Sequence, residues 1–288
     1  DEIQRPSISV KLSALHPRYE MAKDGRMLDT LGGRLADLAR VAREAGIGLT
    51  VDAEEADRLD PSLDLVARVA ADPSLAGWNG FGLAVQAYQK RAHAVIDWVA
   101  ALAGETRRIM PVRLVKGAYW DTEIKRAQER GLASFPVFTR KEATDVSYLA
   151  CARAMLAARD RIYPQFATHN AHTVAAIDVM AGSDRRFEYQ RLHGMGEPLY
   201  EAVLGEAPKG GTPKTVGDGG VSCRIYAPVG AHEDLLPYLV RRLLENGANT
   251  SFVHRLADPT VPVDDLVGDP VARLKGRASR PNPSLPVP

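Results

Sequence analysis

Apolar residues recur along this chain with two alternating periods. Short runs rich in β-branched and aromatic residues are followed repeatedly by stretches in which leucine and alanine return at helical spacing. We expect strands over residues 8–15, 47–54, 81–88, 110–119, 163–170, 187–194 and 223–230. Helices are predicted over 28–45, 62–71, 91–103, 121–130, 143–159, 171–181 and 197–204, and a last one over 234–246. Connections of this length are too long for hairpins, so the pattern indicates a parallel sheet covered by helices.

The count of predicted strands falls one short of the eight in a closed (β/α)₈ barrel. Nothing before Ile8 supplies another strand, so either the sheet is open or its first strand is missing or supplied otherwise. The 288 residues suit a barrel, which uses ~250. We therefore predict an α/β fold, a distorted (β/α)₈ TIM-type barrel, over residues 1–258. A Pro-rich tail follows over 259–288, with one short helix near 266–274, and a long loop is predicted over 205–220.

Composition excludes several classes of protein. The formal net charge is +1, so no strong field draws nucleic acid to the chain. Its two cysteines form no disulfide framework or cysteine-based metal site, which fits a reducing compartment. No apolar run reaches the roughly 18 residues of a transmembrane helix, and surface contact with a membrane stays open.

Hydrogen-bonding side chains stand toward the C-terminal end of nearly every predicted strand. Buried parallel strands normally consist of Val, Ile and Leu, and at any single position a satisfied polar group would explain the exception. Polar groups on all seven strands indicate instead a functional cleft at the edge where barrels place their active sites. They are Lys11, Asp52, Gln86, Arg113, Lys116, His169, Asn170, Gln190, His193, Arg224 and Tyr226.

Cations dominate this predicted cleft. Lys11, Arg113 and Lys116 are joined by Arg241 and Arg242 of the last helix, and the acids are chiefly Asp52 and Glu245. The balance favours anionic ligands, one with a pyrophosphate and a second with a carboxylate. For the last helix alone, a solvated charged face is the alternative. Four neutral residues suit hydrogen bonds to the edge of a heterocycle: Gln86, Thr168, Asn170 and Gln190. Tyr119 and Trp120 fit either stacking on a ring or packing in the core.

Other catalytic motifs are weak or absent. We find no Gly-x-Ser-x-Gly elbow and no Walker loop. His169 and His172 have a spacing that binds zinc on a helix, but they straddle a strand end and a helix start, so their rings should diverge. A hydrogen bond from His169 to a ligand is favoured over a metal. A metal-dependent hydrolase that uses these histidines with Asp52 and Glu54 stays an alternative, as does a catalytically inactive binding domain.

Eight segments carry a resemblance to a known family. They are SVKLSALHPRYE, VDAEEADRLD, AGWNGFGLAVQAYQKR, RLVKGAYWDTEIKRAQ, FATHNAHT, LHGMGEPLYE, CRIYAPVG and YLVRRLLENGANTSFV. In this order, from Ser9 to about Asp258, the chain resembles the proline dehydrogenase domain of the bifunctional proline utilization A flavoenzymes. The resemblance implies a distorted barrel with non-covalent FAD that oxidises L-proline to 1-pyrroline-5-carboxylate, the first step of proline catabolism. Hydride would pass from proline C5 to flavin N5, and electrons would pass on to a membrane quinone.

The resemblance also implies roles for single residues. Lys11, Arg241 and Arg242 would bind the proline carboxylate, with Glu245 orienting the arginines and Asp52 holding Lys11 or an adjacent cation. Tyr226 and Leu192 would pack on the pyrrolidine ring, with Tyr119 nearby. The expected FAD contacts are Gln86, Arg113, Lys116, Trp120, Thr139, Arg140, Thr168, His169, Asn170, Gln190, Arg242 and Glu245. Arg113 is the best candidate for the pyrophosphate or for the N1–C2 locus of the reduced ring.

Partners and departures follow from the same resemblance. The substrate amine must be neutral, and surrounding cations lower its pKa, with water as the expected proton acceptor. Small cyclic or carboxylate analogues should also bind. The full-length protein would carry an aldehyde dehydrogenase domain and act in the bacterial cytoplasm, with peripheral contact at the inner membrane. The family's first barrel strand, with an acidic residue that gates the pocket, should precede Ile8 and is missing from this sequence.

Overall fold

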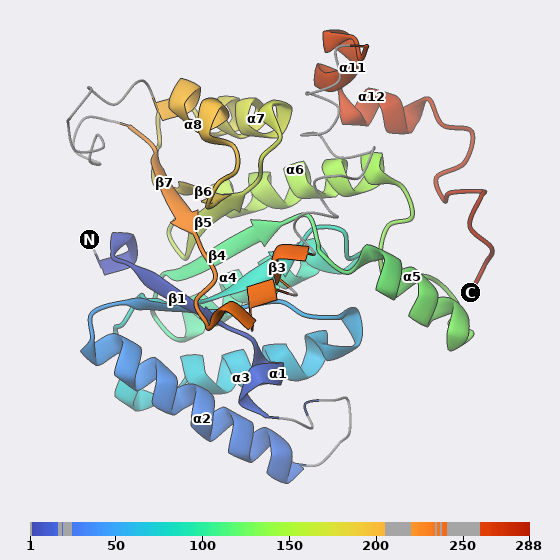
Figure 1. The fold of residues 1–288 in the computed structure, drawn as a ribbon. Helices are drawn as coiled ribbons and strands as arrows, with labels where there is room; N and C mark the ends of the chain where they lie inside the picture. Colours follow the sequence, from blue (N-terminus) through green and yellow to red (C-terminus); the bar gives the residue numbers. More distant parts are fainter. Residues whose placement is uncertain are drawn as a thin grey trace. The chain divides into compact units, whose positions relative to one another are not determined.

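The computed structural model describes residues 2–16, 19, 25–204, 220–233, 235–236, 238–240 and 260–288. The chain divides into two compact units. The first unit comprises Asp1–Gln165 with Arg277–Pro288, and the second comprises Phe166–Gly276. Seven strands alternate with helices in the part that the structure describes, which confirms the predicted α/β class (Figure 1). The predicted boundary at residue 258 stays a prediction, since residues 241–259 lie outside the described part.

Parallel strands form the centre of the first unit. They are β1 (Ser7–Val10), β2 (Gly48–Val51), β3 (Phe81–Gln86) and β4 (Met110–Val115), and each pairs in parallel with the next. β5 (Ile162–Ala167) begins where this unit ends, and the Met110 amide donates to the Arg161 carbonyl at 2.8 Å. Because β1 to β4 are parallel, their C-terminal ends share one edge.

Amphipathic helices cover these strands. They are α1 (Leu12–Leu15), α2 (Gly25–Glu44), α3 (Leu59–Ala70), α4 (Ala92–Glu105), α5 (Trp120–Glu129) and α6 (Lys141–Ala157). α2 packs against α3, and α4 packs against α6. Leu65, Val66 and Val69 return at helical spacing and are buried, so α3 docks through one apolar face. Each such side chain contributes about 1.5–3 kcal/mol through burial.

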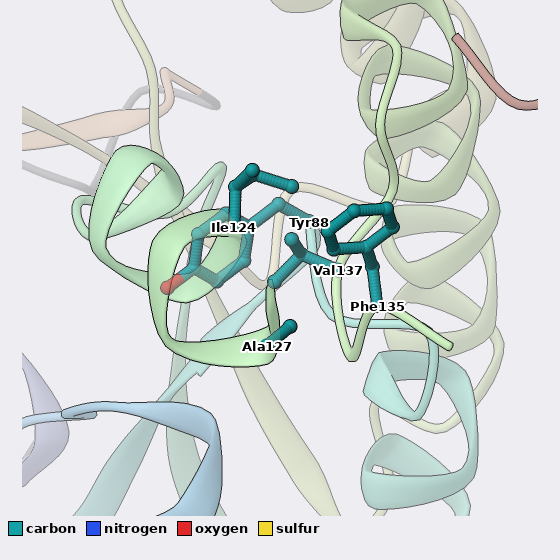
Figure 2. Packing of buried hydrophobic residues seen from close by; sticks show 5 residues of the cluster. All are labelled: Tyr88, Ile124, Ala127, Phe135 and Val137. Atoms are coloured by element: carbon teal, nitrogen blue, oxygen red, sulfur yellow. The ribbon is translucent and has the colours of Figure 1, made fainter. Parts of the chain in front are cut away.

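A separate apolar cluster fixes the segment between α5 and α6. Tyr88 follows β3, Ile124 and Ala127 belong to α5, and Phe135 and Val137 lie on the segment itself (Figure 2). Val137 also forms an isolated antiparallel bridge with Gln89. The cluster thereby holds in place the two residues that precede α6, which the sequence predicts to contact a cofactor.

The second unit is built around aromatic rings. Its elements are α7 (Ala171–Ala181), β6 (Glu188–Leu192), α8 (Glu197–Leu204), β7 (Ser222–Tyr226), α11 (Val263–Val267) and α12 (Pro270–Lys275), and β6 pairs in parallel with β7. Phe166 and Phe187 contact edge-to-face at 5.6 Å, and Phe187 and Tyr189 do so at 5.4 Å. Tyr200 joins them through Tyr189 at 5.7 Å. Edge-to-face pairs of this kind add about 0.5–1.5 kcal/mol each beyond their burial.

Two predicted elements contain a change of structure that the pattern does not indicate. The strand expected over 8–15 ends at Val10, and residues 12–15 form the helical turn α1, which buries Leu12. The polar–apolar alternation continues past the point where the backbone turns. The single helix expected near 266–274 is two helices, because Pro270 lacks an N–H and starts α12, with Asp269 as its N-cap. The predicted loop over 205–220 lies outside the described residues except for its last glycine.

Candidate functional site

Four predicted site residues of the first unit lie at the C-terminal ends of its strands. Lys11 directly follows β1 and Asp52 directly follows β2, while Gln86 ends β3 and Lys116 directly follows β4. Since these strands are parallel neighbours, the four residues belong to the same edge.

Asp52 is the centre of a group of charges at this edge. Its Oδ1 accepts a hydrogen bond from Arg113 Nη1 at 2.7 Å, and its Oδ2 lies 3.8 Å from Lys11 Nζ. Arg113 Nη2 donates to Ser9 Oγ at 2.9 Å, so the guanidinium is held from two sides. The Arg113 side chain is 7% exposed and that of Lys11 is 42% exposed. Two cations share one carboxylate, which leaves a net positive group with a buried member and an accessible one.

Tyr119 and Gln86 connect this group to neighbouring loops. Lys11 Nζ donates to Tyr119 Oη at 3.4 Å. Gln86 is buried, and its Nε2 donates to the Glu54 carbonyl at 2.8 Å while its Oε1 accepts from the Ala118 amide at 3.4 Å. Gln86 therefore ties the loop after β2 to the loop after β4.

Lys116 and Trp120 contact residues on or near α6. Lys116 Nζ forms an ion pair with Asp145 Oδ1 on α6. Trp120 Nε1 donates to the Phe138 carbonyl at 2.8 Å, and its ring packs against the cluster in Figure 2. The indole is therefore part of the packing of α5.

Thr139 and Arg140 are held by the C-terminal residues of the chain. Thr139 Oγ1 accepts from the Asn282 amide at 2.9 Å. Arg140 Nε donates to the carbonyls of Ser279 and Pro281, at 3.1 and 3.2 Å. Arg140 is also the N-cap residue of α6 and makes no side-chain capping bond there. Nothing in the sequence pattern predicts that the tail contacts these two residues.

Polar groups of the second unit follow β5. His169 Nε2 accepts a hydrogen bond from the Leu192 amide at 3.1 Å, so the ring hydrogen resides on Nδ1. The Asn170 amide donates to Thr168 Oγ1 at 3.2 Å, and Asn170 Oδ1 caps α7 by accepting from the Thr173 amide at 3.0 Å. Their amide and imidazole orientations are thus set by backbone groups.

A buried carboxylate organises β6 and β7. Glu188 is 1% exposed, and its two oxygens accept from Arg224 Nε at 2.8 Å and Arg224 Nη2 at 2.9 Å. Gln190 Nε2 donates to Glu188 Oε1 at 2.8 Å, and Gln190 is the register partner of Arg224. Leu192 and Tyr226, both predicted to pack on a substrate ring, are register partners as well. This ladder places two pairs of predicted residues side by side.

Three partners in this network were not singled out from the sequence. Ser9 bonds Arg113, Asp145 pairs with Lys116, and Glu188 pairs with Arg224. An acid inside an apolar strand, two residues before Gln190, could have indicated Glu188. Asp145 lies on a helix that its sequence does not distinguish. Arg241, Arg242 and Glu245 lie outside the described residues, and their roles stay predictions.

One further buried acid lies on α5. Glu123 is 4% exposed, and its Oε1 accepts from the Ala56 amide at 2.6 Å. Burial raises the pKa of this carboxyl, and the nearby Asp57 and Glu55 raise it further, against the amide bond and Arg126. Its contacts tie α5 to the loop after β2, which indicates a structural role.

Three of the four residues named for the metal-site alternative are engaged by other protein groups in the described part of the chain. Among them no three or more His, Cys, Asp or Glu side chains are grouped as metal ligands would be. His169 Nε2 already accepts from the Leu192 amide, and Glu54 accepts from the Ser13 amide at 3.0 Å and from Arg58 at 2.8 Å. Within the same part of the chain, no helix is both long and apolar enough to cross a bilayer.

Comparison with protein families identifies the same resemblance independently. The family model described as Proline dehydrogenase matches residues 1–255. The bifunctional protein PutA of Salmonella typhimurium is 58% identical over 292 residues, which cover 98% of this chain and 22% of that protein. The chain therefore spans about a fifth of the length of such relatives.

Solved structures agree with the sequence comparison. A crystal structure of a Bradyrhizobium japonicum proline utilization A variant is 57% identical with a TM-score of 0.91, covering 98% of this chain and 28% of that chain. Proline utilization A from Bdellovibrio bacteriovorus, inactivated by N-propargylglycine, is 31% identical with a TM-score of 0.83, covering 92% and 27%. The likeness over nearly the whole chain confirms the predicted barrel-type α/β fold class.

Proposed function

Because the chain belongs to the proline dehydrogenase family, we propose that it oxidises L-proline to 1-pyrroline-5-carboxylate with non-covalently bound FAD. The observation that carries the proposal is the pairing of Lys11 and Arg113 with one carboxylate, Asp52. A net positive group fits the carboxylate of an amino acid, and it favours the negative charge that a flavin gains on reduction.

Lys11 is the substrate-binding member of this group. Its ammonium is half-exposed, and Asp52 and Tyr119 keep it at the strand edge. In this proposal it binds the proline carboxylate together with Arg241 and Arg242, which Glu245 orients. Leu192 and Tyr226, side by side on β6 and β7, pack on the pyrrolidine ring.

The same positive charge prepares the substrate for oxidation. Cations close to the proline nitrogen disfavour its protonated form, so they lower the pKa of the amine and release a proton to water. When bound, FAD supplies the acceptor, N5, for the hydride that leaves proline C5. Arg113, held by Asp52 and Ser9, would stabilise the negative charge of the reduced cofactor without having to reorganise.

The donor set of the described residues fits a dinucleotide-like cofactor. Lys116, Thr139 and Arg140 supply cations and a hydroxyl that suit a pyrophosphate. The other proposed contacts are polar or aromatic: Gln86, Trp120, Thr168, His169, Asn170 and Gln190. His169 is held through Nε2 by the Leu192 amide, which orients its ring.

The inactivated relative supports an amine substrate. N-propargylglycine, named with the Bdellovibrio bacteriovorus protein, is a secondary amine with a carboxylate, as is proline. We expect the same compound to inactivate this chain. In the full-length protein, electrons would pass to a quinone at the membrane surface, and an aldehyde dehydrogenase domain would use the product.

An anaerobic absorbance spectrum of the purified protein tests the proposal. We expect a flavin spectrum that L-proline bleaches, with 1-pyrroline-5-carboxylate formed in equal amount. A flavin spectrum that L-proline leaves unchanged would identify an inactive binding domain. Bound zinc without flavin would identify the hydrolase alternative, and either result would overturn the proposal.

A further inference from the structure

The C-terminal tail, residues 277–288, belongs to the first unit and lies beside the residues that precede α6. It contacts them mainly through backbone atoms. The Asn282 amide donates to Thr139 Oγ1 at 2.9 Å, and two tail carbonyls, those of Ser279 and Pro281, accept from Arg140 Nε. Every one of these bonds ends on a residue that the proposed function assigns to FAD.

Anchors on both sides hold the tail in this position. Arg277 forms an ion pair with Glu142 in the first turn of α6. Further along, Leu285 packs against the apolar cluster of Figure 2, and Gln128 Nε2 on α5 donates to the Pro286 carbonyl at 3.2 Å. The tail is therefore fixed at both ends of the segment that bonds Thr139 and Arg140.

The direction of these hydrogen bonds determines what the two side chains can offer to a ligand. A threonine hydroxyl has one hydrogen to donate, and its oxygen accepts through lone pairs. Since Thr139 Oγ1 accepts from the Asn282 amide, its own hydrogen is directed elsewhere, as a donor. The tail holds Arg140 by Nε alone, so the donors on its two Nη atoms lie beyond these contacts. The tail contacts therefore use neither the Thr139 hydroxyl hydrogen nor the Nη donors of Arg140, and both kinds of donor suit an anion.

We infer that residues 277–288 act as a strap that positions Thr139 and Arg140 for the pyrophosphate of FAD, with Leu285 as its positioning residue. The inference rests on the proposed function, because that function supplies the ligand. It adds that a segment outside the parallel strands and their helices contributes to cofactor affinity without touching the reacting atoms. Loosening the strap lets both side chains turn away and reduces affinity while leaving the chemistry of the bound cofactor intact.

A pair of tail variants tests this inference. Leu285→Ser removes the apolar anchor, and Val287→Ser makes the same kind of change at a tail position that is 82% exposed. The dissociation constant of FAD is measured by fluorescence on the full chain, after removal of bound flavin and well below the melting temperature of each variant. We expect Leu285→Ser to raise this constant about tenfold or more. Val287→Ser should leave it within about twofold of the original.

Two further measurements distinguish a role of Leu285 in positioning the strap from a general effect on stability. At saturating FAD, kcat for L-proline should return to the value of the unaltered chain in Leu285→Ser, and Leu285→Met should restore the FAD affinity itself. If Leu285→Ser lowers the melting temperature but leaves the FAD dissociation constant unchanged, the strap has no part in cofactor binding and the inference is wrong. An unaltered chain that binds no FAD would instead contradict the proposed function.

Discussion

The predicted site residues of the two units are held by different means. In the first unit, Asp52 pairs with Arg113, 61 residues away, and with Lys11, whose side chain is 42% exposed. In the second unit, Glu188 is 1% exposed and bonds a residue on its own strand and one on the strand beside it. One group of charges is partly open to a ligand, while the other is enclosed by its own sheet.

This difference separates two uses of a carboxylate. When both oxygens of a buried carboxylate accept hydrogen bonds from the protein, removing the carboxylate is costly. Its donors then lose that acceptor inside the protein. A carboxylate that pairs with two cations, one of them accessible, mainly determines the local charge at the position where a ligand would bind. Changes at Glu188 should therefore act on folding, and changes at Asp52 on catalysis.

The largest expected effect is on stability, at Glu188. Glu188→Ala leaves Arg224 and Gln190 without their acceptor inside the sheet, so we expect a loss of about 3–5 kcal/mol in the free energy of unfolding. Urea denaturation followed by circular dichroism measures it. Glu129→Ala, which breaks the exposed pair with Lys125, is the control and should change little. A loss below about 1 kcal/mol at Glu188 would remove the distinction between the two units.

Asp52→Asn should act on turnover. It removes the charge that holds Lys11 and Arg113, and the loss of a charged hydrogen bond of about 2–3 kcal/mol predicts a decrease of roughly 30- to 160-fold in kcat/KM for L-proline. Steady-state kinetics with a quinone analogue measures it. Asp60→Asn, in an exposed pair with Arg91, should leave kcat/KM near its original value. Equal effects at both positions would show that Asp52 has no special part.

A pair of glycines tests the packing around His169. Gly196 has φ +70°, and an added Cβ would lie 2.8 Å from His169 Cδ2, whereas Gly182 has φ +62° and nothing within 4 Å. Both alanine variants place a side chain at a positive φ that L residues rarely adopt, and at Gly182 the ψ of −132° also lies outside the left-handed helical region. Only Gly196→Ala should also displace His169 and lower FAD affinity. Equal FAD affinity in the two variants would argue against the proposed contact of His169.

The smallest expected effect concerns the pH dependence of stability. Burial raises the pKa of Glu123, so the folded state holds this proton more tightly than the unfolded state. Its contribution therefore falls as pH rises from the ordinary glutamate pKa to the raised folded value, and is level above it. Glu123→Gln keeps an oxygen for the Ala56 amide and should lack this decline, so its advantage grows with pH. Parallel curves for the two proteins, measured by urea unfolding, would contradict the assignment.

The sequence pattern predicted the bounds of a helix well where nearby residues mark its ends. Helices over 171–181 and 197–204 have the predicted bounds, since Asn170 caps the first and Gly182 ends it. The strand over 8–15 was too long because alternation does not reveal where a backbone turns. The break before α12 had its signals, Gly268 and Pro270, which a single-helix prediction overlooked.

The sequence predicted which residues belong to the candidate site better than it predicted the partners that they contact. Strand-end positions identified Lys11, Asp52 and Gln86, because parallel strands bring their ends to one edge. The pairing of Lys116 with Asp145, and the return of Asn282 to Thr139, join residues 29 and 143 positions apart. No periodicity encodes such contacts, so they required the structure.

The central claim is that L-proline delivers a hydride from C5 to a flavin held by this chain. Anaerobic stopped-flow reduction with L-proline deuterated at C5, compared with L-proline deuterated at C2, tests it most directly. The account predicts that the rate of flavin bleaching falls several-fold with C5 deuterium and is unchanged with C2 deuterium. An isotope effect confined to C2, or no bleaching at all, would contradict it.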